Sequence, residues 1–282
     1  MGKIFLTADS SVDLTPELLE KYDIKTRPFL VTVGDKSYLD GIEINPELLY
    51  QKIKETGVMP KTAAITMADY EDLFKSLTEG GNEVIHFNIS SGFSCAHQNA
   101  LIAAEEVEGV YVVDSRNLST GTALLVLKAY DMIKEGKTAK EIYEEITKLT
   151  ENVEASFVLD TLEYLHKGGR CSGVAALGAN ILKLRPCIEV KEGKMGVGKK
   201  YRGKIEDCFY SYVRERLEGR DDLDLERIFI TQSGSVSKEV QDKIEEIILS
   251  IAPFKEVLRT TAGCTVSAHC GPGTMGILFI RK

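Results

Sequence analysis

The sequence lacks tryptophan, has only seven prolines in 282 residues and contains no long apolar run. A membrane-spanning helix needs ~18–20 uninterrupted apolar residues. No segment provides them, so stable insertion into a membrane is not expected. Positive charge is also in the minority, because 35 lysines and arginines stand against 43 aspartates and glutamates, with no basic run. Since nucleic-acid binding depends on clustered positive charge, the composition argues against a nucleic-acid partner.

An export signal and a metal-binding pattern are absent as well. After a short apolar stretch the N-terminus reaches Asp9 and Asp13, which does not match a secretory signal. The six cysteines are scattered without a C-x-x-C pair, and together with the four histidines they show no ligand spacing typical of zinc. We therefore expect a cytoplasmic protein with reduced thiols, no metal site and no cofactor.

What the sequence does contain is a repeated order of apolar strand, small polar turn and amphipathic helix. Strands are expected at residues 3–7, 83–89 and 110–114, and each is followed by a segment that contains serine. Strands that alternate with helices indicate right-handed crossovers and a largely parallel sheet flanked by helices. Side chains suited to capping mark the expected helix starts at Thr15, Asn45, Thr66 and Thr138.

The second half of the chain changes character. Residues 186–190 and 195–201 flank a Lys-Glu-Gly-Lys turn, which is typical of a β-hairpin. Another strand and helix follow from Ile228, and residues 274–280 read as a last strand. We therefore expect two α/β domains, covering residues 1–155 and residues 156–282.

Two glycine motifs resemble phosphate-binding loops but lack the required context. Gly193 and Gly198-Lys199 match most of a P-loop, yet Lys200 stands where the Mg²⁺-binding hydroxyl belongs, and a hairpin turn explains both glycines. Residues 271–276 fit G-x-G-x-x-G, but too few residues follow for the helix and strand of a dinucleotide-binding unit. Neither motif predicts nucleotide binding.

Hydroxyl side chains gather where the expected strands end. In an open parallel sheet the carboxyl ends of the strands face the ligand crevice, and hydroxyls beside helix N-termini can hold a small anion such as a carboxylate. The alternative is that each hydroxyl only caps a helix or closes a turn. The residues concerned are Ser10, Ser11, Thr62, Ser90, Ser91, Ser94 and Ser115.

Two further polar residues stand beside glycine-rich turns. His269 lies just before a Gly-Pro-Gly turn, which would fix the direction of its imidazole. Arg170 follows Gly168-Gly169 and is either a solvated charge or an anion contact.

Short motifs follow one another in a definite order along nearly the whole chain. They are T-A-D-S-S-V-D-L from Thr7, P-K-T from Pro60, I-S-S-G-F-S from Ile89, V-V-D-S from Val112, D-T-L-E-Y-L from Asp160, G-G-R from Gly168, R-G from Arg202 and H-x-G-P-G from His269. No single motif is specific, but the ordered set resembles the DegV family of bacterial fatty-acid-binding proteins, which includes the acyl-binding subunit of fatty acid kinase.

The resemblance implies a two-domain α/β fold with a mostly parallel sheet in the N-terminal domain and a mixed sheet in the C-terminal domain. A long-chain fatty acid such as palmitate would lie between the domains, with its carboxylate on Thr62, Ser94 and His269. As a separate hypothesis, Arg170 and Arg202 contact a partner or a phosphate. The protein would be a carrier without catalytic residues, with a role in lipid transport or fatty-acid metabolism. It would present the carboxylate to the catalytic subunit of a fatty acid kinase for acyl-phosphate formation.

Two segments depart from the family pattern. Ala63-Ala64-Ile65 replaces a usual Ser-Gln-Pro, and Cys95-Ala96 replaces a usual Gly-Thr. The hydroxyls are retained while the rim of the pocket differs, so the acyl-length preference is not fixed by the resemblance. A saturated C16–C18 acid at near one-to-one occupancy is expected.

Two other functions stay open. Residues 92–96 approximate the G-x-S-x-G turn of serine hydrolases, with Ser94 as nucleophile, His269 as base and Asp114 or Asp160 as the third member of a triad. Against this, the serines before Gly92 lengthen a turn that is tight in such enzymes. The second alternative is a module that only binds other proteins. Such a protein would carry no lipid after purification.

Overall fold

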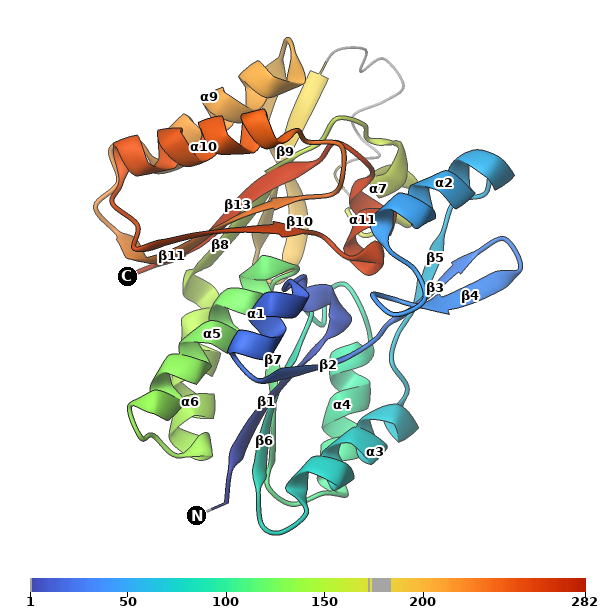
Figure 1. The fold of residues 1–282 in the computed structure, drawn as a ribbon, viewed down its shortest axis with the longest axis vertical. Helices are drawn as coiled ribbons and strands as arrows, with labels where there is room; N and C mark the ends of the chain where they lie inside the picture. The colour runs from blue at the N-terminus through green and yellow to red at the C-terminus, as the bar shows by residue number, and fades with distance from the viewer. Residues whose placement is uncertain (1, 172, 174–183) are drawn as a thin grey trace.

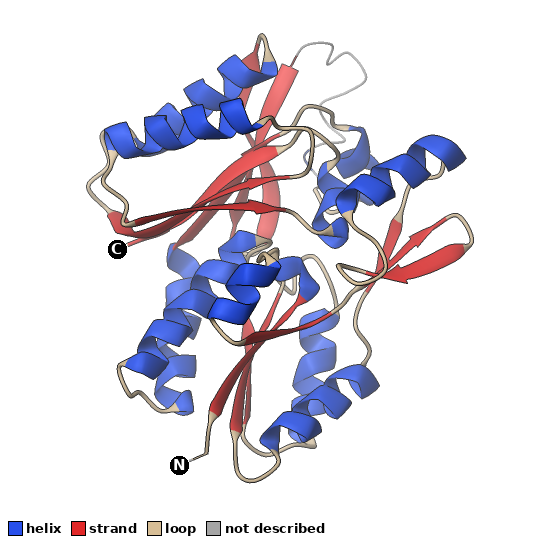
Figure 2. Cartoon of the chain, in the orientation of Figure 1, coloured by secondary structure: helices blue, strands red, loops and turns tan. Residues whose placement is uncertain are grey.

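The computed structural model describes residues 2–171, 173 and 184–282. In these residues the strands form one parallel, one mixed and one small antiparallel sheet, with helices packed on them (Figures 1 and 2).

The parallel sheet occupies the N-terminal half of the chain. Its strands lie in the order β2-β1-β6-β7, and all neighbouring pairs are parallel. Figure 1 shows α3 and α4 on one side of this sheet and α1, α5 and α6 on the other, which confirms the expected arrangement. The elements are β1 (Ile4–Asp9), α1 (Pro16–Lys21), β2 (Ile24–Arg27), α3 (Met67–Thr78), β6 (Glu83–Asn88), α4 (Ala96–Glu105), β7 (Val110–Asp114), α5 (Thr120–Lys134) and α6 (Ala139–Leu149), with short 3₁₀ turns at Ser10–Val12 and Thr150–Asn152.

The mixed sheet follows, in the order β10-β9-β8-β13-β11-β12. Only β11 and β12 pair in parallel; the other neighbours are antiparallel. The boundary expected after residue 155 falls inside β8, so this sheet begins at Val153. Helices α9 and α10 cover its outer face (Figure 1). The elements are β8 (Val153–Val158), α7 (Glu163–Gly168), β9 (Leu184–Lys191), β10 (Lys194–Arg202), α9 (Ile205–Leu217), β11 (Leu223–Gln232), α10 (Lys238–Ile251), β12 (Glu256–Thr261), α11 (Cys264–Cys270) and β13 (Met275–Arg281).

The expected hairpin and the local helix signals are confirmed. β9 and β10 pair antiparallel, and Gly193 lies in their turn, so the P-loop-like motif is part of a hairpin with no helix after it. Residues 271–276 likewise lead into strand β13 rather than into a helix. The side chains of Thr15, Asn45, Thr66 and Thr138 each accept a hydrogen bond from a backbone N–H in the first turn of their helices.

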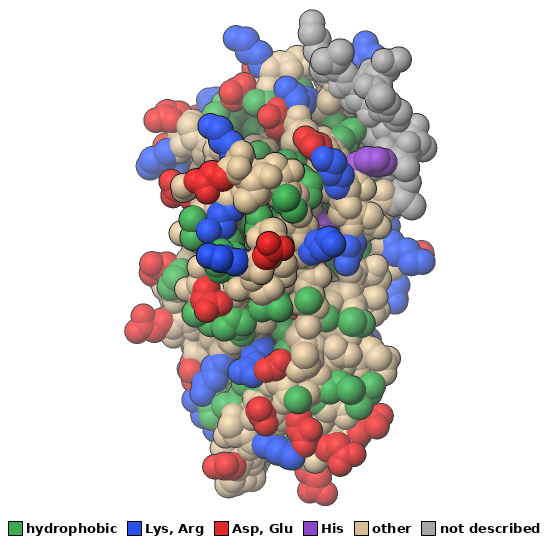
Figure 3. Space-filling view, turned by 90° about the vertical axis from the view of Figure 1, so that its right-hand side faces the viewer, with side chains coloured by type: hydrophobic (Ala, Val, Ile, Leu, Met, Phe, Trp, Pro, Cys, Tyr) green, Lys and Arg blue, Asp and Glu red, His purple; other side chains and the backbone are tan. Residues whose placement is uncertain are grey.

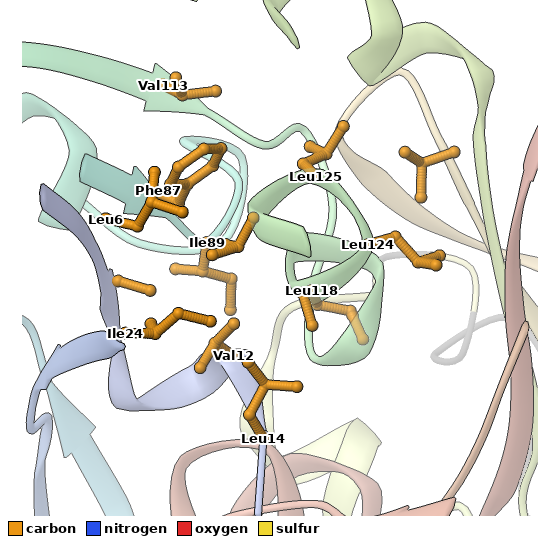
Figure 4. Packing of buried hydrophobic residues seen from close by; sticks show 14 of the residues in the cluster. Leu6, Val12, Leu14, Ile24, Phe87, Ile89, Val113, Leu118, Leu124 and Leu125 are labelled. Carbon is orange, nitrogen blue, oxygen red and sulfur yellow. The ribbon is translucent and has the colours of Figure 1, made fainter. Parts of the chain in front are cut away.

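Helix α5 lies between the two large sheets. It packs on β1 and β6 of the parallel sheet and on β8, β11 and β13 of the mixed sheet. Its residues from Thr120 to Leu127 are all buried, so this part of the helix has no polar face for a sequence pattern to reveal. Figure 4 shows Leu124 and Leu125 of this helix in one core with side chains of the parallel sheet such as Phe87.

A small antiparallel sheet was not anticipated from the sequence. It consists of β3 (Leu30–Val33), β4 (Lys36–Leu39) and β5 (Lys61–Ala63), with α2 (Pro46–Thr56) beside it. Figure 1 shows these elements next to α11, far along the sequence, and the two share a separate hydrophobic core. Figure 3 shows the surface on this side, where lysines and arginines lie among hydrophobic side chains and acidic side chains gather at the lower end. The hydrophobic core that the small sheet and α2 share with α11 contains Val31, Val33, Ile44, Leu49, Ile53, Cys264 and Ala268.

A buried carboxyl group joins the two halves of the molecule. Asp13 is 5% exposed, and it accepts hydrogen bonds from the Gly263 amide (2.7 Å) and from the Ser119 hydroxyl. Burial is the main cause that raises the pKa of Asp13 from 3.8 to about 8; the two hydrogen bonds oppose the rise, and nearby Asp40 adds to it. Asp13 is therefore protonated at neutral pH.

We predict that Asp13→Asn removes a pH-dependent cost of folding. Because the folded-state pKa is raised, the unfolded chain releases this proton first, and native stability is lost as pH rises from about 4 to about 8. Asparagine retains an oxygen for Gly263, can donate to Ser119, and tolerates the positive φ of 54°. At neutral pH the variant should gain on the order of a few kcal/mol over the parent.

Urea unfolding of both proteins at about pH 5, 7 and 8.5 checks this prediction. The difference in unfolding free energy between variant and parent should grow from the lowest pH to about pH 8 and then level off. A difference that does not change with pH would mean that Asp13 is ionised in the folded protein.

Candidate functional site

A cavity of about 440 Å³ lies where the small sheet, α4 and α11 meet. Thr62 comes from β5, Ser94 from the turn before α4, and His269 from α11. The structure thus brings the three residues expected to hold a carboxylate to the lining of a single cavity. The other lining residues are Phe29, Ala64, Ile89, Ser91, Gly92, Phe93, Cys95, Leu118, Arg170, Met195, Thr265, Val266 and Cys270.

Thr62 and His269 are in direct contact across the cavity wall. Thr62 Oγ1 lies 3.2 Å from His269 Nε2, although the two residues are 207 positions apart in sequence. β5 carries Thr62, and β5 pairs with β3, whose side chains pack on α11. The packing of the small sheet on α11 therefore produces the contact.

The imidazole of His269 is neutral at physiological pH. Burial, together with the positive charge of Arg170, lowers its pKa to about 4. Its Nδ1 is buried and has no hydrogen-bond partner among the described residues. Gly168 lies against this nitrogen, because a Cβ atom there would stand 2.3 Å from Nδ1. The lack of a side chain at Gly168 thus permits the close approach of α7 to the histidine.

Ser94 is held by the turn that starts α4. Its backbone N–H donates to the Ser90 carbonyl (3.3 Å), and its Oγ accepts from the Ala96 amide (3.2 Å). The hydroxyl therefore stands at the amino end of a ten-residue helix, where positive partial charge favours an anion. Cys95, the next residue, is exposed and also lines the cavity.

Four of the seven strand-end hydroxyls do not line this cavity. Ser10 donates to Asp40 (3.1 Å), Ser90 to the Gly193 carbonyl (2.7 Å) and Ser115 to the Asn117 carbonyl (3.2 Å). Ser11 is buried, and its hydroxyl has no partner among the described residues. Hydrogen bonds elsewhere in the fold thus occupy Ser10, Ser90 and Ser115, and of the seven hydroxyls only those of Thr62, Ser91 and Ser94 belong to residues that line the cavity.

The two arginines expected near the site occupy different places. Arg170 lines the cavity, is exposed, and donates from Nη1 to the Gly168 carbonyl (2.8 Å). Arg202 ends β10 opposite Leu184, is exposed and is not among the lining residues. Its role as a partner contact stays a prediction.

The inner end of the cavity is apolar. A second cavity of about 30 Å³ shares Leu118, Val266 and Cys270 with the first and continues toward Phe157 and Leu278 of the mixed sheet. Burial raises the pKa of the Cys270 thiol to about 12, so this side chain is uncharged. Sequence reasoning missed these apolar residues, because a side chain that lines a cavity has the same pattern as one in a core.

A larger cavity, of about 680 Å³, is lined mainly by charged side chains. Arg216 pairs there with Glu154 (2.7 Å) and Glu189 (3.2 Å), and Arg220 also pairs with Glu154 (2.9 Å). An apolar ligand in this space would remove these charges from water without replacing their hydration. The smaller cavity is therefore the better candidate for a lipid.

The residues of the hydrolase alternative are not arranged as a triad. In the described part of the chain no hydrogen bond joins Ser94 to His269, and no carboxylate contacts His269 Nδ1. Asp114 accepts from Ser91, while Asp160 pairs with Arg185 (2.8 Å). A triad requires the base to contact both nucleophile and acid, so this geometry does not favour the hydrolase. The described residues also contain no group of three or more His, Cys, Asp or Glu side chains arranged to hold a metal ion.

Comparison with known proteins places these observations in a family. A family model described as "Uncharacterised protein, DegV family" matches residues 3–282. A DegV domain-containing protein of Clostridium perfringens is 31% identical over 100% of both chains. A DegV family protein from Thermus thermophilus, described as binding fatty acid, has a TM-score of 0.89 at 28% identity and covers 99% of this chain and 100% of its own. A stearic acid-binding protein from Eubacterium ventriosum has a TM-score of 0.84 at 26% identity, covering 100% of this chain and 99% of its own.

The family resemblance inferred from the ordered motifs is thus confirmed by sequence and by fold, and its structurally characterised relatives include fatty-acid-binding proteins. The chain belongs to the DegV family.

Proposed function

We propose that this protein binds a long-chain fatty acid, with the carboxylate at Thr62, Ser94 and His269 and the tail directed past Val266 toward the mixed sheet. The observation that carries the proposal is the contact of Thr62 with a neutral, partly buried His269 at one end of a cavity whose other end is apolar. Fatty-acid binding by the Thermus thermophilus and Eubacterium ventriosum relatives supports the same ligand class.

Hydroxyl groups and a neutral imidazole suit a carboxylate that leaves water. The carboxylate must be hydrogen-bonded once buried, and Thr62 and Ser94 each offer an O–H donor. We assign the proton of His269 to Nε2, because the isolated Nδ1 is then an acceptor rather than an unsatisfied buried donor. Nε2–H would then donate to Thr62 Oγ1, so His269 would act on the carboxylate through Thr62, whose own proton is left to point at the ligand.

The apolar tail would supply most of the affinity. At ~0.8 kcal/mol per buried methylene, about fourteen methylenes contribute on the order of 11 kcal/mol before the entropy of association is subtracted. The hydrogen bonds to the carboxylate then set the orientation of the fatty acid in the cavity. Since neutral donors hold the carboxylate without a tight ion pair, an oxygen is left available as a nucleophile.

The carrier would act together with a kinase. A partner catalytic subunit would transfer a phosphoryl group to the bound carboxylate and give an acyl phosphate, so this chain itself needs neither a cofactor nor a catalytic residue. Arg170, which lines the cavity and is exposed, would contact the partner or the phosphate. We place this function in the cytoplasm. Its reducing conditions suit the six cysteines, which form no disulfide in the described part of the chain. No helix in the described ranges is long and apolar enough to cross a membrane.

Removing the headgroup donors should weaken fatty-acid binding. Thr62→Val and Ser94→Ala each delete a hydrogen bond to a charged group, so each should raise the Kd for a C16–C18 acid about 10- to 100-fold. Native mass spectrometry should show lipid in the parent protein and loss of occupancy in the variants. Thr32→Val, on neighbouring strand β3 and outside the cavity, is the matched control. Equal affinity in Thr62→Val, Ser94→Ala and Thr32→Val would contradict the assigned headgroup site.

The passage at Val266 should set the tolerated chain length. Val266 lines both cavities, so Val266→Phe would narrow the route that the tail takes. We expect the affinity for C16–C18 acids to fall more than the affinity for C10–C12 acids, and Val266→Ala to relax this discrimination. Titration of each variant with a C16–C18 acid and with a C10–C12 acid measures the ratio of the two affinities. A ratio unchanged from the parent in both variants would show that the tail follows another route.

Arg170 should matter for the partner more than for the lipid. Arg170→Ala should leave the fatty-acid Kd within about twofold while lowering the rate of acyl-phosphate formation with the kinase subunit. Lys167→Ala serves as control, because Lys167 lies in the same region, pairs with Glu163 (2.7 Å) and does not line the cavity. If docking and phosphorylation are both unchanged in Arg170→Ala, the role assigned to this residue is wrong.

A further inference from the structure

Asp40 is a buried carboxylate that contacts α11 from the small sheet. It follows β4 and is 2% exposed. Its Oδ1 accepts from the Cys264 amide (2.8 Å), and its Oδ2 accepts from the Thr265 amide (3.0 Å) and the Thr265 hydroxyl (2.6 Å). Ser10 also donates to Oδ2 (3.1 Å). Four hydrogen bonds therefore converge on this side chain from the 3₁₀ turn after β1 and from α11.

These contacts replace a cap that α11 lacks. The residue before the helix is Gly263, which has no side chain to accept from the first turn. Asp40 supplies the acceptor from more than two hundred residues away, and its charge suits the amino end of a helix. A Cβ atom at Gly263 would stand 3.1 Å from Asp13 Oδ1 and 3.3 Å from Asp40 Oδ1, so two carboxyl groups lie against this end of α11.

The opposite end of the same helix carries His269. α11 is seven residues long, so its amino end and His269 lie little more than one turn apart. Thr62, which contacts His269, lies in β5, and Asp40 directly follows β4; both strands pair with β3 of the small sheet. Between the two contacts, Cys264 and Ala268 pack on Val31, Val33 and Leu49. The small sheet therefore holds α11 by a polar contact at each end and by apolar packing between them.

We propose that Asp40 is a positioning residue for the carboxylate site, because it fixes the amino end of α11 and thereby keeps His269 within reach of Thr62. The inference rests on the proposed function for its effect on fatty-acid binding, while its effect on His269 is independent of any ligand. Loss of the Asp40 contacts frees the first turn of α11 and changes the orientation of the imidazole relative to β5. Thr265 and Val266, which line the cavity from that first turn, shift with it.

The test compares Asp40→Ala and Asp40→Asn with Thr138→Ala. Asp40→Asn keeps one oxygen acceptor and guards against failure of Asp40→Ala to fold. Thr138→Ala removes the capping box of α6, which is remote from the cavity, and so controls for a general loss of stability. For each protein the ring-nitrogen chemical shifts of His269 are measured by ¹H–¹⁵N NMR without ligand, together with the thermal midpoint and the Kd for a C16–C18 acid.

We expect the His269 nitrogen signals to move in both Asp40 variants and to stay in place in Thr138→Ala. The Kd should rise about tenfold or more in Asp40→Ala and less in Asp40→Asn, with no change in the control. Asp40 variants that lower the thermal midpoint but leave the His269 signals at their parent positions would overturn the proposal. If the parent protein binds no fatty acid while the His269 signals still move, the proposed function fails and the positioning role stands.

Discussion

The packing of α11 on the small antiparallel sheet is the interaction on which the rest of the site depends. It joins residues 30–63 to residues 264–270 through a core of their own, separate from the cores of the two large sheets. Thr62 and His269 meet because of this packing. Ser94 reaches the same cavity from the other side, at the start of α4 on the parallel sheet. The candidate carboxylate site therefore lies between the small sheet with α11 and the parallel sheet with α4, and neither part contains the whole site.

Burial determines the chemistry of the groups at this junction. The same loss of hydration that makes the imidazole of His269 neutral also keeps Asp13 protonated, since in each case the charged form is the one that desolvation disfavours. Donors without a full charge can then hold a lipid carboxylate. Asp40 is buried as well, but three hydrogen bonds from α11 and one from Ser10 compensate its lost hydration.

Much of the fold could be predicted from local patterns. Thr15, Asn45, Thr66 and Thr138 cap helices where expected, because capping involves residues only three positions apart. The alternation of strands and helices likewise predicts the parallel sheet. The small sheet was not predicted, since its strands are short, and its stability depends on α11 at the other end of the chain. The first half of helix α5 gave no amphipathic signal, because its residues from Thr120 to Leu127 are all buried and the helix packs on both large sheets.

For the site, the ordered motifs by themselves determined the family and indicated Thr62, Ser94, His269 and Arg170, because residue identity and order are properties of the chain alone. Which hydroxyls face the cavity was decided only by the tertiary structure: Ser10, Ser90 and Ser115 carry the same signal as Ser94 but form hydrogen bonds elsewhere in the fold. The tertiary structure alone also determined which apolar residues line the cavity and that Asp40 contacts α11. The physical reason is that burial and hydrogen bonding between distant residues arise only when the chain has packed, and no local pattern encodes them.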